Sequence, residues 1–166
     1  MKRALFIGRF QPFHNAHLLE IKNILKEADE IIIAIGSSQQ KNTQENPFSY
    51  KERKEMITQV LKKNKIKRFK IHPIPDFYND KKWIDYIQKK MPRFEIVYSG
   101  NALTLRCFKK YNITAKKIKL IKGVNSTRIR DMIIHDEDWQ KLVPRESSDH
   151  IKKIGGISRI KKTVND

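Results

Sequence analysis

Two histidines lie three residues apart near the start of the chain, in a stretch that reads Gly8-Arg9-Phe10-Gln11-Pro12-Phe13-His14-Asn15-Ala16-His17. Imidazoles at this spacing project from neighbouring points of one helical turn. A helix start offers unpaired backbone N–H groups and the positive end of the helix dipole, and both favour phosphate. The glycine lets a ligand approach the backbone closely. The stretch predicts a phosphate site; the alternative for an isolated pair of histidines is a surface position or a helix cap.

A second candidate anion site lies late in the chain, in the stretch Gly123-Val124-Asn125-Ser126-Thr127-Arg128-Ile129-Arg130. Asn125 or Ser126 can serve as the N-cap of a helix that runs through Ile134. Thr127 and Arg130 then share one face of the first turn, where a guanidinium fork and the helix start can hold the same phosphate. The alternative interpretation is an ordinary capped helix with basic surface residues.

Five short apolar runs, separated by helical patterns, must position these two stretches. The runs cover residues 4–7, 30–35, 69–74, 95–98 and 117–121. The second run is continuous rather than alternating, which is typical of a strand buried on both faces of a parallel sheet. Helices are expected after the first motif, from a capping box at Ser49 and Glu52, from Trp83, and from Asn101. The alternation predicts an α/β fold: a doubly wound, five-stranded parallel sheet with C-terminal helices, in a single domain of residues 1–166.

The ends of these strands are the expected ligand edge, because open parallel sheets bind ligands beyond the carboxyl ends of their strands, where the winding reverses. The last run is only weakly apolar, so we expect it at an edge of the sheet. Residues at or just beyond the strand ends, or in the first motif, are candidate substrate contacts: Ile7, Gly8, Phe10, Gly36, Ser37, Asp76 and Asn79.

The net charge of the chain limits the classes of partner that we expect it to bind. Among 166 residues, 36 Lys and Arg stand against 18 Asp and Glu, for a formal net charge of +18. Such a balance favours polyanions, either small phosphates or nucleic acid. The basic residues are spread along the chain and no aromatic-basic repeat of an RNA-binding sheet is visible, so we do not expect nucleic acid.

The cysteine count and the lengths of the apolar stretches bear on disulfides, metal sites and membrane spans. The one cysteine, Cys107, excludes an internal disulfide and a thiolate zinc cage, and we predict no metal site built from the chain's own residues. No apolar stretch approaches the length that spans a membrane. We expect a cytoplasmic protein without a membrane partner.

The first motif resembles that of the nucleotidyltransferases with a glycine-x-phenylalanine-x-proline-x-histidine-x-x-histidine signature, although Ala16 stands where glycine is usual. Thr127 and Arg130 match a second motif of the same superfamily, in which Asn125 replaces a serine. Further stretches make the chain similar to the archaeal-type nicotinamide-nucleotide adenylyltransferases from residue 3 to about residue 163: Glu45-Asn46-Pro47-Phe48, Glu52-Arg53, Tyr98-Ser99-Gly100-Asn101, Asp138-Trp139, Leu142-Val143-Pro144 and residues 154–160.

The resemblance implies a reaction in which ATP and nicotinamide mononucleotide (NMN) give NAD and pyrophosphate, with Mg²⁺ accompanying ATP. It implies that His14, His17, Arg9 and Arg130 stabilise the transferring phosphoryl group. Contacts to adenosine and phosphate are implied for Gly100, Asn101, Ser126 and Thr127, and a homo-oligomer such as a hexamer is expected. Trp83 is expected to stack on the nicotinamide ring, although a lone aromatic on an amphipathic helix is more often a core residue. Trp139 is expected to be packing.

Three alternatives remain open at the level of sequence. The nearest is another nucleotidyltransferase of the same fold, acting on flavin mononucleotide or phosphopantetheine. The positive charge could instead indicate an RNA-binding module. The third is a metabolite-binding protein without turnover.

Overall fold

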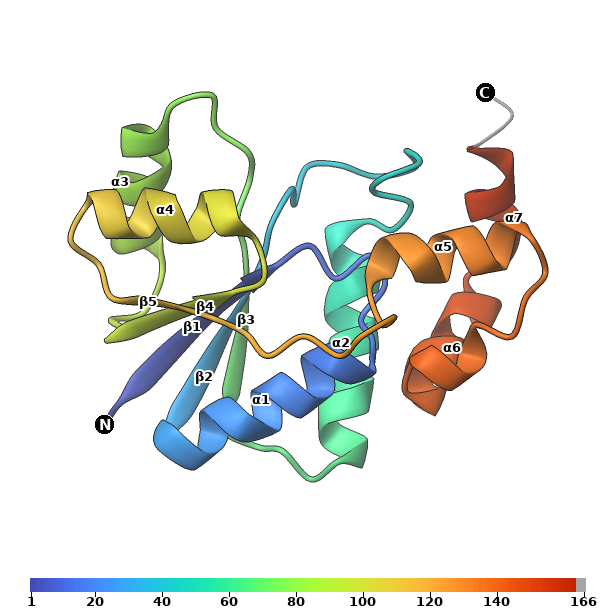
Figure 1. Cartoon of the computed structure of the whole chain (residues 1–166), viewed down its shortest axis with the longest axis horizontal. Coiled ribbons are helices and arrows are strands. Elements are labelled where there is room, and N and C mark those ends of the chain that lie inside the picture. Colours follow the sequence, from blue (N-terminus) through green and yellow to red (C-terminus); the bar gives the residue numbers. More distant parts are fainter. Residues whose placement is uncertain (164–166) are drawn as a thin grey trace. The chain divides into compact units, whose positions relative to one another are not determined.

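The computed structural model describes residues 1–163 and contains a parallel sheet flanked by helices (Figure 1). The strands are β1 (Arg3–Gly8), β2 (Glu30–Ile35), β3 (Phe69–Pro73), β4 (Ile96–Ser99) and β5 (Ala115–Lys117). The helices are α1 (Asn15–Glu27), α2 (Tyr50–Lys63), α3 (Asp80–Lys90), α4 (Ala102–Lys110), α5 (Ser126–Ile134), α6 (Arg145–Lys153) and α7 (Gly156–Lys162), with a 3₁₀ helix η1 (Gln140–Leu142). The predicted α/β fold with C-terminal helices is confirmed.

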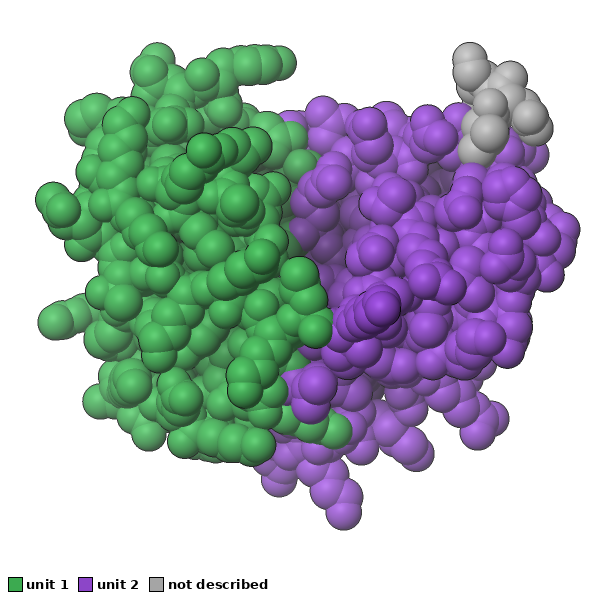
Figure 2. Space-filling model, in the orientation of Figure 1, with its two compact units in different colours: residues 1–8, 20–38, 68–120 green, residues 9–19, 39–67, 121–166 purple. Residues whose placement is uncertain are grey.

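The chain divides into two compact units (Figure 2). The sheet unit comprises residues 1–8, 20–38 and 68–120, and the helical unit comprises residues 9–19, 39–67 and 121 onward. The boundary falls within α1, between Leu19 and Glu20. The single domain of residues 1–166 stays a prediction, and residues 164–166 lie outside the described part of the chain.

The sheet has the strand order β3-β2-β1-β4-β5, and every neighbouring pair is parallel. β1 pairs with β2 from Arg3 opposite Glu30 to Gly8 opposite Ile35, and with β4 on its other side. The chain thus winds outward through β2 and β3 and then returns to the far side of β1. The winding reverses between β1 and β4, which is where a doubly wound sheet binds its ligands.

Both faces of the central strands are buried, which explains their continuous apolar runs. On one face, Leu5, Ile7 and Ile32 form a core with residues of α3 and α4, which lie over that side of the sheet in Figure 1. Residues that point the other way, such as Phe6 and Ile33, are also buried. Burial on two sides removes any reason for polar alternation, so β2 forms over the residues predicted for it, 30–35.

The predicted fifth strand was wrong in position. β5 covers Ala115–Lys117 rather than residues 117–121, although it is an edge strand as expected. The backbone N–H of Ile118 still donates to the backbone carbonyl of Ser99 at 3.2 Å. The chain then leaves the sheet, and Leu120 is exposed. The apolar side chain of Ile118 is buried next to Gly100, beyond the end of the strand. The apolar residue Ile118 in the run 117–121 therefore packs beyond the end of the strand and does not belong to the strand itself.

Helix starts follow the side-chain caps. Ser49 and Glu52 form the predicted capping box of α2, and Asn101 caps α4 as predicted. α5 begins at Ser126 because Asn125 is its N-cap. α3 begins at Asp80 rather than at Trp83, because the Asn79 side chain accepts from the Lys82 N–H one turn before the apolar stripe.

In the helical unit, α2 packs against α6, and α7 packs against both α5 and α6. Trp139 is buried, which confirms its predicted packing role. Within residues 1–163, no helix combines the length and apolar character needed to cross a membrane.

Candidate active site

The first motif forms a loop in the helical unit whose two phenylalanines line the ring of His17. Phe10 and Phe13 are buried, and their ring centroids lie 4.8 and 5.4 Å from that of His17. Phe10 adopts a left-handed backbone conformation with φ of 53°, which turns the chain sharply after Arg9. The aromatic residues of the motif thus build an apolar wall behind an imidazole.

His14 and His17 lie against each other at the start of α1. Their rings stack with centroids 3.5 Å apart and planes 15° apart. The backbone N–H of His14 donates to Nδ1 of His17 at 3.2 Å, which is the contact that a glutamate makes in a capping box. Nδ1 of His14 is buried and has no hydrogen-bond partner within the described chain. The pair therefore caps the helix and also presents buried imidazole nitrogens, so the cap and phosphate interpretations fit the same geometry.

Burial keeps both imidazoles neutral at neutral pH. It lowers the pKa of His14 to about 4. Burial also lowers the pKa of His17 well below its ordinary value, and the neighbouring His14 lowers it further. Since two imidazolium ions cannot stack at this distance without strong repulsion, the pair acts first as neutral hydrogen-bonding groups.

The two motifs meet within the helical unit. Arg130 is 8% exposed, and its Nη1 donates to the backbone carbonyl of Gln11 at 2.8 Å. Ser126 Oγ donates to the carbonyl of Pro12 at 2.9 Å. The start of α5 is therefore bonded directly to the loop of the first motif.

Arg9 lies close enough to Arg130 to affect its ionisation. Burial lowers the pKa of Arg130, the positive charge of Arg9 lowers it further, and Glu45 acts in the opposite sense. Two guanidinium groups from separate motifs thus come together in the helical unit. Thr127 is exposed on the first turn of α5, and Arg128 is also exposed, with its Nη1 near Gly123.

In the sheet unit, the ends of neighbouring strands are tied together. The Gly36 N–H donates to the Gly8 carbonyl at 2.9 Å, which joins the end of β1 to the residue after β2. Ser37 has a left-handed φ of 46°, and its Oγ donates to Oδ1 of the exposed Asp76 at 2.9 Å. The structure therefore places together two candidate residues that lie 39 positions apart in the chain.

The other sheet-unit candidates have structural partners. Asn79 and Asn101 use their side-chain oxygens to cap α3 and α4. Gly100 is exposed after β4, where an added Cβ would lie 3.3 Å from the Ile118 side chain. Trp83 is half-buried and meets Phe108 edge-on at 5.4 Å. Packing fixes one edge of this indole.

The sequence analysis names Arg53 only as part of a matching stretch and gives it no role, but the residue is completely buried. Its Nη1 donates to the carbonyl of Arg9 at 2.8 Å. Arg53 precedes Met56 and Ile57 by three and four residues, so helical spacing alone would have placed it on the apolar face of α2. Among the described residues, no group of three or more histidine, cysteine, aspartate and glutamate side chains is arranged to hold a metal ion.

Comparison with solved structures supports the fold. A bifunctional NMN adenylyltransferase/ADP ribose pyrophosphatase from Francisella tularensis is 27% identical, with a TM-score of 0.77 over 86% of this chain and 44% of that one. A second structure from that organism, complexed with AMP and Mn ion, has a TM-score of 0.81 at 24% identity over 99% and 53% of the two chains. This chain spans about half the length of these bifunctional proteins.

Comparison with known sequences shows the family. A family profile described as Cytidylyltransferase-like matches residues 5–153. The nicotinamide-nucleotide adenylyltransferase of Methanococcus aeolicus is 44% identical over 96% of this chain and 94% of that protein. The protein of the same name from Thermoplasma acidophilum is 41% identical over 96% and 90%. The chain therefore belongs to the cytidylyltransferase-like family and, within it, to the nicotinamide-nucleotide adenylyltransferases.

Proposed function

We propose that the protein transfers the adenylyl group of ATP to NMN and so produces NAD and pyrophosphate. A phosphate oxygen of NMN attacks the α-phosphorus of ATP, where a new P–O bond forms. The bond from the α-phosphorus to the oxygen that bridges to the β-phosphate breaks, and its electron pair leaves with pyrophosphate. Because the nucleophile is already a phosphate oxygen, catalysis needs in-line positioning and charge stabilisation rather than a strong base.

The observation that carries the proposal is the joint placement of two arginines and two stacked, buried histidines in the helical unit. Arg9 and Arg130 lie near enough for one to lower the pKa of the other. A bound triphosphate would offset the repulsion between these two guanidinium groups and accept their hydrogen bonds. We assign Arg9 and Arg130 to the phosphates of ATP, with Ser126 and Thr127 beside them at the start of α5.

The histidines stabilise the transition state as hydrogen-bond donors. His17 accepts a hydrogen bond on Nδ1, so its neutral ring carries its proton on Nε2. We assign that N–H, and the ring of His14, to the oxygens around the α-phosphorus, where negative charge increases as the reaction proceeds. Removing one donor of this kind typically lowers a rate by about 10²–10³.

Further residues are assigned to the nucleoside parts of the two substrates. Trp83 stacks on the cationic nicotinamide ring of NMN, a favourable arrangement for an indole face. Gly100 and Asn101 contact adenosine. The remaining proposed substrate contacts are Ile7, Gly8, Phe10, Gly36, Ser37, Asp76 and Asn79.

A divalent cation enters as part of the nucleotide substrate. One similar solved structure contains AMP and a Mn ion. We propose that Mg²⁺ binds the phosphates of ATP and neutralises charge on the leaving pyrophosphate.

We further propose that the protein works in the cytoplasm as a homo-oligomer. Light scattering coupled to size-exclusion chromatography tests the assembly: a mass that is a multiple of 19.7 kDa is expected, and a monomer would contradict it.

Pyrophosphate release from ATP against a panel of acceptors tests the function. NMN should support release, whereas flavin mononucleotide and phosphopantetheine should not, and CTP should replace ATP poorly. A preference for either other acceptor would assign the chain to another activity of the same fold. No release with any acceptor would contradict the proposed enzyme.

A further inference from the structure

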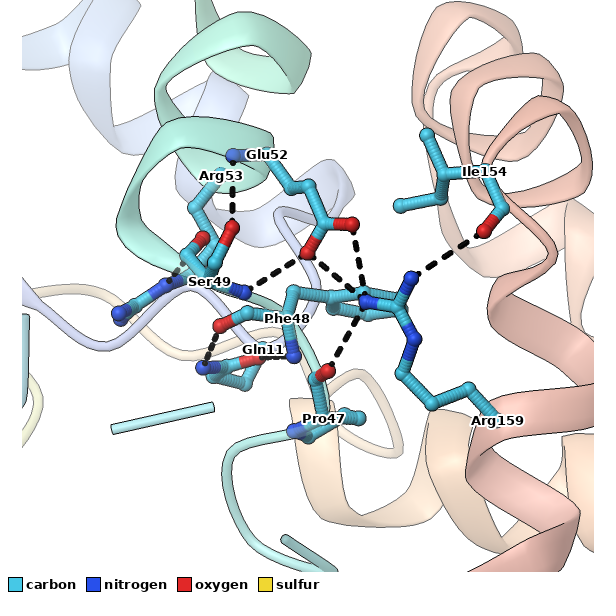
Figure 3. Close-up of polar contacts among 8 residues, drawn as sticks. All are labelled: Gln11, Pro47, Phe48, Ser49, Glu52, Arg53, Ile154 and Arg159. Atoms are coloured by element: carbon cyan, nitrogen blue, oxygen red, sulfur yellow. Dashed lines mark hydrogen bonds and ion pairs between the residues drawn. The ribbon is translucent and has the colours of Figure 1, made fainter. Parts of the chain in front are cut away.

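Arg159, on the last helix α7, is hydrogen-bonded to three separate residues of the helical unit (Figure 3). Its Nη1 lies 2.9 and 2.8 Å from the two carboxylate oxygens of Glu52 and 3.2 Å from the carbonyl of Pro47. Its Nη2 donates to the carbonyl of Ile154 at 3.2 Å. The side chain is only 26% exposed, so these are well-shielded contacts rather than a loose surface ion pair.

Glu52 passes this contact to the start of α2. Its Oε2 accepts from the Ser49 N–H at 2.8 Å, while its own N–H donates to Ser49 Oγ. Burial alone would raise the pKa of Glu52, but the hydrogen bonds from Arg159 and Ser49 outweigh burial and lower it. The carboxylate thus stays charged, and it ties Arg159 to the segment of residues 47–53, defined here as the support segment.

The support segment holds the backbone of the first motif. Gln11 is buried and bonds Phe48 in both directions: its Nε2 donates to the Phe48 carbonyl at 2.8 Å, and its Oε1 accepts from the Phe48 N–H at 3.0 Å. Arg53 donates to the carbonyls of Arg9 and Ser49. The main chain of Arg9 is therefore fixed by a side chain that does not itself belong to the motif.

Helix α7 reaches the support segment by a second route. A Cβ built at Gly156 would lie 2.8 Å from the ring of Phe48 and 2.9 Å from the carbonyl of Ile151. No side chain larger than glycine fits at this position without a shift of its neighbours. The first turn of α7 thus packs directly on the residue that Gln11 holds.

We infer that Arg159 is a positioning residue for catalysis: through Glu52, Pro47 and the support segment, it fixes the backbone from which Arg9 reaches the triphosphate. This inference rests on the proposed function. A misplacement of about 1 Å in a catalytic constellation can cost about 10²-fold in rate, so a contact outside the site can affect turnover strongly.

Steady-state kinetics on four variants test this inference. Arg159→Gln should lower kcat about 10-fold and leave KM for NMN largely unchanged, since Arg9 is assigned to ATP. Arg159→Lys keeps a charge next to Glu52 and should recover part of the rate, because only the guanidinium reaches Pro47 and Ile154 together. In an Arg9→Ala background, Arg159→Gln should change kcat by less than about 2-fold, because its effect passes through Arg9. The same factor in both backgrounds would reduce Arg159 to a stability role and overturn the inference.

The matched control is Lys161→Gln on the same helix. Lys161 pairs at 2.6 Å with Asp136, which is not part of the support segment, so its loss should leave kcat at the parental value. A loss equal to that of Arg159→Gln would contradict a specific route through Glu52.

Hydrogen–deuterium exchange separates this inference from the proposed function. Arg159→Gln should speed exchange in peptides that cover residues 9–13 and leave β2 unchanged, whether or not NMN is the acceptor. Parental exchange at residues 9–13 would overturn the inference, whereas an absence of pyrophosphate release from the parental protein would overturn the function alone.

Discussion

The backbone N–H of His14 donates to Nδ1 of His17 at 3.2 Å while the two rings stack with centroids 3.5 Å apart. A ring nitrogen that accepts a hydrogen bond carries no proton, so this contact fixes the tautomer of His17. The three-residue spacing of the motif is what lets the N–H at the helix start reach the second ring. One contact therefore both caps α1 and aims Nε2–H of His17.

His17→Gln is expected to lose most turnover and to fold normally. Glutamine at this helix position can accept the same backbone hydrogen bond, but its flexible amide does not hold an N–H in the fixed place of the ring Nε2–H. The expected loss of kcat is about 10²–10³. His17→Ala should lose as much turnover and also some stability, because the cap is gone, and His14→Ala should lose turnover similarly. Saturating kinetics and urea unfolding measure the two effects, and near-parental kcat in His17→Gln would exclude a catalytic role.

The free energy of unfolding should decrease as the pH is lowered through the range in which the buried histidines titrate. Unfolding returns His14 from a pKa of about 4 to its ordinary 6.5, so between these values the unfolded chain binds a proton that the folded chain does not. Stability is fully present above pH 6.5 and is lost as the pH falls toward 4. The loss from His14 is on the order of 3 kcal/mol, and the depressed pKa of His17 adds to it.

Urea unfolding at pH 7.5 and 5.0 measures this dependence. The double variant His14→Gln/His17→Gln should lose less stability between the two pH values than the parental protein, because its amides do not titrate. An equal loss of unfolding free energy between pH 7.5 and 5.0 in the two proteins would show that burial does not hold these imidazoles neutral.

Arg130→Ala should lower kcat strongly, and Arg130→Lys should lower it less. Lysine keeps the charge, but it cannot hold a phosphate with two parallel bonds while also donating to the Gln11 carbonyl. Arg128→Ala is the matched control, because Arg128 is exposed and points about a half-turn away from Arg130 around the helix, and it should show a milder loss. Steady-state kinetics on the three variants give the comparison. A larger loss of kcat in Arg128→Ala than in Arg130→Ala would mean that the phosphate binds on the Arg128 face of α5 and would contradict the assignment.

Trp83→Ala should raise KM for NMN more than KM for ATP. Trp83→Phe keeps a ring that can meet Phe108 edge-on, so it separates packing from stacking and should have a smaller effect. Initial rates with each substrate varied in turn give both constants. An equal rise in both, or a failure of the alanine variant to fold, would make Trp83 a core residue.

Strong local signals made much of the fold predictable. The continuous apolar run of β2 and the capping box of α2 specify their elements by themselves, and both formed where expected. β5 was misplaced because Ile118 is buried at a strand end, which looks in sequence like a strand interior. α3 was predicted to start late because its cap, Asn79, lies in a polar loop that offers no apolar stripe.

The sequence singles out the residues of the two motifs, but it does not single out the residues that hold those motifs in place. Type and spacing single out His14, His17 and Arg130 as candidates because side chains of these types can bind phosphate, and the structure places all three in the helical unit. Gln11 and Arg53 act on backbone groups of Phe48 and Arg9, 37 and 44 positions away, and sequence spacing holds no trace of such pairings. The same is true of Arg159, which acts on Glu52 across 107 positions.

The most direct test of the account is ³¹P NMR of the parental protein with ATP and NMN. Attack at the α-phosphorus predicts that the diphosphate signal of NAD and the signal of pyrophosphate appear together in a one-to-one ratio, and only when both substrates are present. Release of orthophosphate and ADP, or pyrophosphate formed without NMN, would contradict adenylyl transfer to NMN.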